Sequence, residues 1–363
     1  MSRLVIDLAR ITANARAVVQ SCRPLGVEIR AVTKALQGCP RVGRAMLQGE
    51  VAGLADSRLL NLERLGQALG PLPLMLLRLP SPSRAGAIVA SAAISLNSEP
   101  ATLNLLDLAA RQRGLTHQII LMVDLGDRRE GVLPADVEAA GREIARYQAL
   151  ELVGIGSNFA CYGGVMPSAD NLGELVELAE RVRRVTGLKL PVVSGGNSTS
   201  LRLVEEGSMP QGITQLRVGE AILLGREPST GRPIAGTGGD AFRLQVEVIE
   251  VKRRPSLPRG QVARDAFGRE PRYQDRGERL RALGAIGVQD LGAGSIAPEA
   301  PGIEVLGASS DHLILDVTET GSPVQVGDHL WFRPDYGALL ALATCPHVER
   351  HYIGDQDARR TMT

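Results

Sequence analysis

The sequence predicts a (β/α)8 barrel of the TIM type followed by a C-terminal β domain. The first observation is an alternation of short β-type runs and helical patterns from residue 28 onward, which is typical of parallel βα units. The second is a change after Gly225, where the runs become short, β-rich and punctuated by glycine and proline. The third is the length of 363 residues, which at roughly 150 residues per domain suggests two domains or one large barrel with an appendage.

The barrel requires eight strands separated by helical segments. A helix over 10–21 precedes the first strand, and stretches such as 135–147 and 171–186 have apolar residues at helical spacing. A six-stranded Rossmann sheet is the alternative, but the residues after the first strand contain no G-x-G-x-x-G fingerprint. The expected strands are 28–34, 52–56, 74–79, 92–97, 118–125, 150–158, 190–194 and 215–224.

The C-terminal part reads as a separate domain. A linker rich in Gly, Pro, Ser and Thr spans 226–240, and an exposed, irregular excursion is expected over 253–281. The predicted domains are a barrel over residues 11–228 and a β domain over 235–363, which the N-terminal strand region 1–10 is expected to join. The expected strands of the β domain are 242–253, 303–306, 313–317 and 325–332.

Composition excludes several classes of protein. The 41 basic and 40 acidic residues nearly cancel, whereas a nucleic-acid partner usually requires a basic stripe. No apolar run reaches the 18 residues of a membrane span, and the N-terminus lacks a signal peptide's long apolar stretch. The four cysteines share no metal-site spacing. We therefore expect a cytoplasmic enzyme with no nucleic-acid or membrane partner and no metal.

Lysine is scarce in this chain. Lys34, Lys189 and Lys252 are its three lysines, so arginine supplies the other 38 of the 41 basic residues. A GC-rich genome would account for such a bias. A position that keeps lysine nevertheless raises the question of whether it needs an amine, because lysine can form an imine and arginine cannot.

Polar residues stand where the predicted strands end, which is where the active site of a barrel enzyme gathers. The first strand leads directly into Lys34, so burial is expected to lower the pKa of its amine. After the seventh strand, Asn197 and Ser198 open a helix, either as an anion cradle or as simple caps. Arg217, between apolar residues of the eighth strand, needs an acceptor such as a ring nitrogen or a carboxylate, unless it forms a structural ion pair.

An amine, a phosphate cradle, a buried guanidinium and the Asn158 amide after the sixth strand together match a pyridoxal phosphate site. A metal site is disfavoured, because these strands carry no cluster of histidines or carboxylates.

These residues resemble a known family. Val32-Thr33-Lys34-Ala35, Asn197-Ser198 and Arg217-Val218-Gly219 look like the fold-type III pyridoxal phosphate enzymes of the alanine racemase group. The resemblance covers nearly the whole chain and is closest to the ornithine racemase-like branch of amino-acid racemases. The segments that carry this closer similarity are Leu54-Ala55-Asp56-Ser57-Arg58-Leu59, Asn158-Phe159-Ala160-Cys161-Tyr162-Gly163-Gly164, Gly307-Ala308-Ser309-Ser310-Asp311-His312-Leu313 and Tyr336-Gly337-Ala338-Leu339-Leu340.

The resemblance implies a racemase that interconverts the L- and D-forms of a free amino acid, and it assigns roles by position. Lys34 would hold pyridoxal 5'-phosphate covalently and serve as one of two bases, while Arg217 would face the pyridine nitrogen. Arg129 would lie beside the substrate, and Asn158 takes the place of a ring-stacking histidine. The residues implied in cofactor binding are Lys34, Asn158, Asn197, Ser198, Arg217, Gly219, Glu220 and Tyr352.

The sequence also departs from the alanine racemases. The β-domain tyrosine that serves as their second base is absent, and the carbamylated-lysine position looks like Met122. Ornithine, or another basic or polar amino acid, is therefore favoured over alanine. The candidates for the second base, in order, are Asp265, Cys161, His312 and Tyr273.

A basic substrate requires a carboxylate, for which Asp127, Glu130 and Asp311 are candidates. By this resemblance, Ser310 and Asp311 would lie near the cofactor of a partner subunit. The resemblance therefore implies a homodimer with shared active sites. Two alternatives remain open: another fold-type III activity, such as a decarboxylase or lyase, and a non-catalytic carrier of the cofactor. A purely structural role is disfavoured by the convergent polar strand ends.

Overall fold

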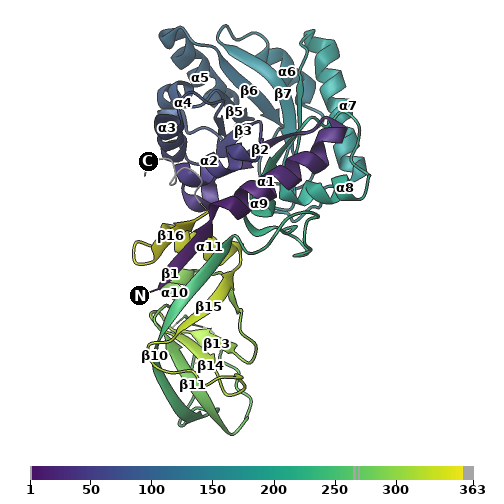
Figure 1. The fold of residues 1–363 in the computed structure, drawn as a ribbon. Helices are drawn as coiled ribbons and strands as arrows, with labels where there is room; N and C mark the ends of the chain where they lie inside the picture. Colours follow the sequence, from purple (N-terminus) through teal and green to yellow (C-terminus); the bar gives the residue numbers. More distant parts are fainter. Residues whose placement is uncertain (1, 265–266, 269, 355–363) are drawn as a thin grey trace. The chain divides into compact units, whose positions relative to one another are not determined.

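The computed structural model describes residues 2–264, 267–268 and 270–354 and forms two compact units (Figure 1). The barrel unit is Leu8–Gly239, and the β unit consists of the described residues within Met1–Asp7 and Asp240–Thr363. Asp265, one of the predicted second bases, lies outside the described residues.

The barrel unit closes a ring of parallel strands, which confirms the predicted TIM-type fold. Its interior is filled by apolar side chains such as Val32, Ile94 and Met122, as expected for strands buried on both faces. The strands, in ring order, are β2 (Glu28–Val32), β3 (Gly53–Asp56), β4 (Met75–Leu76), β5 (Ile94–Asn97), β6 (His117–Met122), β7 (Leu150–Ser157), β8 (Val192–Gly195) and β9 (Gln215–Val218).

Helices cover the outside of the ring (Figure 1). The longest of them, α7, begins at a capping box in which Ser168 Oγ accepts from Asn171 N while Asn171 Oδ1 accepts from Ser168 N. The helices of this unit are α1 (Leu8–Cys22), α2 (Pro40–Gln48), α3 (Leu59–Leu69), α4 (Ala85–Ser91), α5 (Pro100–Arg113), α6 (Val137–Ile144), α7 (Ala169–Thr186), α8 (Leu201–Glu205) and α9 (Glu220–Leu224).

One predicted strand of the barrel is wrong in its second half. Residues 215–224 were expected to form a single strand, but β9 ends at Val218 and Glu220 begins α9. The apolar run Ala221–Leu224 is fully buried, and a buried helix and a buried strand have the same apolar pattern over so short a length.

The unit boundaries follow from contacts of the first helix. β1 (Arg3–Asp7) ends where Leu8 begins α1, so residues 8–10 belong to the barrel unit. The buried Asn14 of α1 donates from Nδ2 to Ile222 O at 3.0 Å and to Gly238 O at 2.8 Å, and its Oδ1 accepts from Gly238 N. These bonds attach the end of the expected linker to the barrel unit.

The β unit contains a sheet in the order β12-β15-β10-β11-β14-β13. β1 joins it, pairing antiparallel with β10 and parallel with β16. Its remaining elements are β10 (Phe242–Pro255), β11 (Glu278–Gly284), β12 (Ile296–Pro298), β13 (Glu304–Ala308), β14 (Leu313–Asp316), β15 (His329–Pro334), β16 (Glu349–Ile353), α10 (Val288–Leu291) and α11 (Tyr336–Thr344). The strand expected over 325–332 begins only at His329, because Gln325 N and Asp328 Oδ2 close a turn before it.

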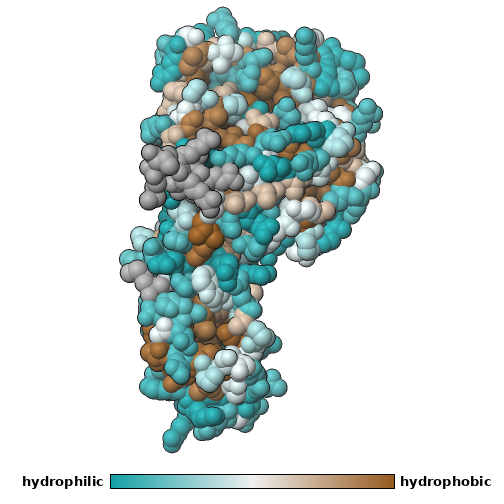
Figure 2. Space-filling view, viewed as in Figure 1, coloured by the Kyte–Doolittle hydropathy of each residue, from teal (hydrophilic) through white to brown (hydrophobic). Residues whose placement is uncertain are grey.

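Polar and apolar side chains are interspersed on the surface. Figure 2 shows hydrophilic side chains spread over the viewed face of both units, with hydrophobic ones between them. Within the described residues, no helix has the length and apolar content that crossing a bilayer requires.

Gly154 provides a test of the packing of the ring. A Cβ atom at Gly154 on β7 would lie 2.0 Å from Val192 O, so we expect Gly154→Ala to destabilise the protein by about 2–3 kcal/mol. Gly173, within α7, has no atom within 4 Å of such a Cβ, and Gly173→Ala should stabilise by about 0.5–1 kcal/mol. Urea unfolding of both variants checks this, and equal stability of the two would contradict the described register of β7 and β8.

Candidate active site

Lys34 follows strand β2 at one end of the barrel. The strand is held there by Thr33, which is fully buried, donates from its backbone N to Ala55 O at 3.0 Å and donates from Oγ1 to Asp56 Oδ2 at 2.7 Å. Lys34 then begins a 3-10 turn, Lys34–Leu36. The backbone that carries the amine is therefore fixed by the neighbouring strand β3.

Asp56 was not among the site residues expected from the sequence. Its carboxylate is fully buried at the end of β3, where it accepts hydrogen bonds from Thr33, from Arg58 N at 2.9 Å and from Asn61 Nδ2 at 3.0 Å. Burial raises the pKa of Asp56, and these hydrogen bonds oppose the rise. The sequence did contain a signal for Asp56. It stands at the carboxyl end of a predicted strand, within a segment that carried the family resemblance.

The electrostatic surroundings of Lys34 favour a neutral amine. Solvent reaches its side chain, yet protein atoms surround it on enough sides that burial is the main cause of a lowered pKa. Arg129 lowers the pKa of Lys34 further, whereas Cys161 and the two nearby carboxylates oppose the shift. The expectation of a depressed pKa at this lysine is confirmed in direction.

Arg217 lies in the barrel on β9. Its guanidinium is buried and donates from Nη2 to Ser157 O at 2.7 Å and from Nη1 to Ser194 Oγ. Burial lowers the pKa of Arg217 to about 10. Among the described residues no carboxylate forms an ion pair with it, so the structural ion pair considered from the sequence is not found. A neutral acceptor, such as a ring nitrogen, suits a cation held in this way.

The loops after β8 and β9 bring a group of polar atoms together. Ser198 Oγ, which is buried, accepts hydrogen bonds from Gly219 N and Ala221 N, each at 3.3 Å. Asn197 Oδ1 caps the following turn by accepting from Thr199 N and Thr199 Oγ1, and its Nδ2 donates to Phe159 O at 2.7 Å. The cap interpretation therefore holds for Asn197, while the amides of Gly219 and Ala221 converge on Ser198 Oγ and bring three polar groups together.

Arg129, between β6 and α6, links several of the predicted residues. It forms an ion pair with Glu130 through two short contacts and donates from Nη1 to Cys161 Sγ at 2.8 Å. The side-chain amide of Asn158, oriented so that both of its polar atoms are satisfied, accepts from Arg129 Nη1 and Nη2 at 3.2 and 3.3 Å. The Glu130 hydrogen bond is the main cause that raises the pKa of Arg129, so this side chain remains a cation.

Asp127 is used to build the loop that follows β7. It is buried, and its carboxylate accepts from Cys161 N and Tyr162 N, both at 3.1 Å. Gly163 N donates to Asp127 O at 2.9 Å, and a Cβ at Gly163 would lie 2.6 Å from that oxygen. Asp127 is therefore not available to a basic substrate, because its side chain is buried and both of its oxygens accept backbone amides.

The structure groups the predicted residues by unit. The residues of the barrel unit are Lys34, Arg129, Asn158, Cys161, Asn197, Ser198, Arg217, Gly219 and Glu220. Those of the β unit are Tyr273, Ser310, Asp311, His312 and Tyr352. Tyr352 is half-buried on β16, whereas Ser310, Asp311 and His312 are exposed in the turn between β13 and β14.

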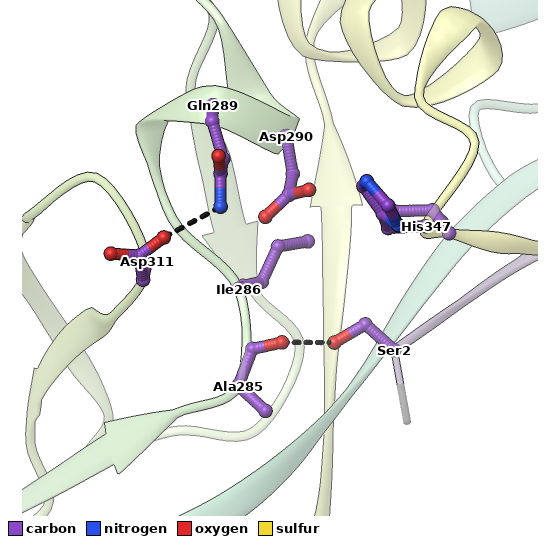
Figure 3. Close-up of a pocket in the computed structure, with 8 residues that line it drawn as sticks. Ser2, Ala285, Ile286, Gln289, Asp290, Asp311 and His347 are labelled. Carbon is purple, nitrogen blue, oxygen red and sulfur yellow. Dashed lines mark hydrogen bonds between the residues drawn. The ribbon is translucent and has the colours of Figure 1, made fainter.

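Asp311 lines a cavity of about 230 Å³ in the β unit (Figure 3). Its Oδ1 accepts from Gln289 Nε2 at 2.6 Å, and its Oδ2 from Ser310 Oγ at 3.0 Å. Asp290, drawn between Gln289 and His347, is the buried carboxylate of this cavity and accepts from Cys345 Sγ at 3.1 Å. The cavity thus combines two carboxylates with an imidazole.

Residues 6–227 match the family described as alanine racemase, N-terminal domain. The chain belongs to this family. The match confirms the family that the sequence motifs predicted and spans the whole barrel, from β2 to α9.

Two curated relatives extend the similarity to the full length of the chain. An ornithine racemase of Acetoanaerobium sticklandii is 42% identical over 97% of this chain and 99% of its own. A lysine racemase of Thermotoga maritima is 41% identical over 96% of this chain and 98% of its own.

Solved structures show the same fold. The alanine racemase of a D-cycloserine-producing Streptomyces lavendulae is 21% identical, with a TM-score of 0.77 and coverage of 98% of both chains. The alanine racemase of Bartonella henselae, solved with covalently bound pyridoxal phosphate, is 19% identical, with a TM-score of 0.74 and coverage of 97% of this chain and 99% of its own.

Over 2–264, 267–268 and 270–354, no group of three or more His, Cys, Asp or Glu side chains has an arrangement that could hold a metal ion.

The lowered pKa of Lys34 gives a pH-dependent prediction for the cofactor-free protein. Because a lowered pKa releases the proton at lower pH, an amine-selective reagent should modify Lys34 at a pH below that at which it modifies a free lysine amide. Labelling over a pH series, followed by peptide mapping, measures the midpoint. A midpoint at Lys34 equal to or above that of the free amide would contradict the described surroundings.

Proposed function

We propose that this protein interconverts the L- and D-forms of a free basic amino acid, ornithine or one of similar charge, in preference to alanine. The observation that carries the proposal is the convergence of Lys34, Ser198 and Arg217 at one end of the barrel. The reaction class, an amino-acid racemase that depends on pyridoxal phosphate, is the predicted one and is confirmed by the family and its full-length relatives.

The residues present fit the cofactor. The Lys34 amine supplies the group that condenses with its aldehyde, and Ser198 with the neighbouring amides of Gly219 and Ala221 provides donors for its phosphate. Arg217, a buried cation without a carboxylate partner in the described chain, suits the ring nitrogen. We assign further contacts to Asn158, Glu220 and Tyr352. When bound, pyridoxal phosphate makes the proton at the amino acid Cα acidic by withdrawing electrons.

The chain's own residues then have to move that proton. Lys34, with its lowered pKa, is suited to take or return a proton at Cα on one face of the substrate. Racemisation requires a second acid/base on the opposite face, for which the sequence offered four candidates. Arg129, held by Glu130 and Cys161, is positioned by its charge to receive the substrate carboxylate.

Several features support a basic substrate and a dimer. The two curated relatives are named for ornithine and lysine, both of which carry a second ammonium group. Asp311 offers an exposed carboxylate beside the cavity of the β unit.

We propose that Ser310 and Asp311 complete the site of a partner subunit in a homodimer, and that the protein acts in the cytoplasm, where free amino acids are abundant.

Replacing the cofactor lysine tests the central assignment. Lys34→Ala should abolish the yellow colour of the protein supplied with pyridoxal phosphate and reduce racemisation of L-ornithine by more than about 10³-fold. Lys189→Ala, a change outside the site, should retain both. Absorbance spectra and chiral analysis measure the outcome, and borohydride reduction with peptide mapping should place the cofactor on Lys34. Label on Lys189 or Lys252 would overturn the assignment.

Substrate charge gives a second test. Asp311→Asn should raise the KM for ornithine about tenfold, equivalent to about 1.4 kcal/mol, because the variant loses the charge that pairs with the distal ammonium. Racemisation of norvaline, which has the same carbon chain without that ammonium, serves as the control and should change little. An equal loss for both amino acids would assign Asp311 a structural role instead.

A further inference from the structure

We propose that Cys161 is the second proton-transfer residue, which exchanges a proton with the substrate Cα on the face opposite Lys34. The inference rests on the proposed function and deepens it, because it selects one residue from the candidates for the second acid/base. It is carried by the position of Cys161 in the ring, by its neighbours and by the way its loop is held.

Lys34 and Cys161 reach the end of the barrel from different strands. Lys34 follows β2, and Cys161 lies in the loop after β7, with β9 and β8 between these strands in the closed ring. Arg129 enters from the loop after β6, on the far side of β7. Two groups that exchange protons on opposite faces of one substrate require such separate points of attachment.

The neighbours of Lys34 narrow the choice of the second acid/base. The side chains near Lys34 that can exchange a proton and that affect its pKa are Cys161, Asp56 and Glu220. Asp56 is fully buried, with its carboxylate engaged by Thr33 and two other donors, so it is not free to reach a substrate. Glu220 has a side chain only 15% exposed that lies 3.7 Å from Arg226 Nε. Cys161 is exposed to solvent, so its thiol can meet a ligand.

A hydrogen bond from Arg129 fixes the position of the thiol. Arg129 Nη1 donates to Cys161 Sγ at 2.8 Å, so a cation stands directly beside the sulfur that would exchange the proton. Arg129 is itself held by an ion pair with Glu130. Glu130 and Arg129 thus act as positioning residues for the thiol.

The loop that carries Cys161 is built to hold it in one place. Asp127 accepts the backbone N–H groups of Cys161 and Tyr162, and Ala160 N donates to Val165 O at 2.7 Å. Ala160 has a positive φ of 48°, a conformation that a non-glycine residue adopts at a cost. A surface cysteine without a role requires none of these restraints.

The proposed step conserves protons. In one direction the Lys34 amine takes the proton from Cα, the Cys161 S–H bond breaks, and a new Cα–H bond forms on the opposite face. In the other direction the thiolate takes the proton and the Lys34 ammonium supplies one. Exchange with water returns both side chains to their starting states, so no oxidant or co-reactant is needed.

Hydrogen exchange in heavy water distinguishes this role from a structural one. Cys161→Ser keeps the size of the side chain but is a much poorer acid, so racemisation should fall by about 10²–10⁴-fold. One enantiomer of ornithine, the one whose Cα proton faces Lys34, should still exchange that proton for deuterium without inversion, while the other should not exchange. The yellow colour of the bound cofactor should persist, which separates this result from failure to hold pyridoxal phosphate.

The controls and contrary outcomes are equally specific. The Cys39→Ser variant should racemise ornithine and exchange its Cα proton like the wild-type protein. Iodoacetamide should inactivate this variant by alkylating Cys161, and ornithine should protect it. Near-normal racemisation by Cys161→Ser, or equal loss of exchange for both enantiomers, would overturn the proposal. One-sided exchange in Asp265→Asn or His312→Asn instead would assign the role to that residue. An unmodified protein that stays colourless would refute the proposed function itself.

Discussion

The hydrogen bonds of the Arg217 guanidinium are the interaction on which the end of the barrel depends. From β9, this side chain reaches Ser157 O at the end of β7 and Ser194 Oγ on β8, so one cation links three neighbouring strands. Burying a charge without a carboxylate is costly, and the cost is offset only by such directed hydrogen bonds. The loops that carry Asn158, Cys161 and Ser198 begin where these strands end.

Two buried carboxylates extend this organisation to the rest of the site. Asp56 fixes Thr33 and hence the residue before Lys34, while Asp127 fixes the amides at the start of the Cys161 loop. Both belong to the class of buried acids whose oxygens are satisfied by nearby donors. Neither is free to act on a substrate; each holds in place a side chain that can.

The groups around Lys34 shift its pKa in opposite directions. Burial and Arg129 favour its neutral form, and Cys161, Asp56 and Glu220 oppose them. Arg129 in turn is held by Glu130, which occupies the adjacent position in the chain. A carboxylate of the chain therefore lies directly beside this arginine.

The barrel, the β-rich second part and the residues at the strand ends were predictable from the amino-acid sequence, because strand periodicity and short polar motifs are local properties. Lys34 and Arg217 were predictable in the same way, since a lysine directly after an apolar strand and an arginine between apolar residues are visible without coordinates. The folded chain was needed to show that Asp127 binds backbone amides, that Asp56 supports Lys34, and that Cys161 contacts Arg129. These contacts join residues from different strand ends, and closing the ring is what brings such distant positions together. Likewise, the local pattern of 220–224 fits a buried strand and a buried helix equally well, and only the folded chain shows that it is a helix.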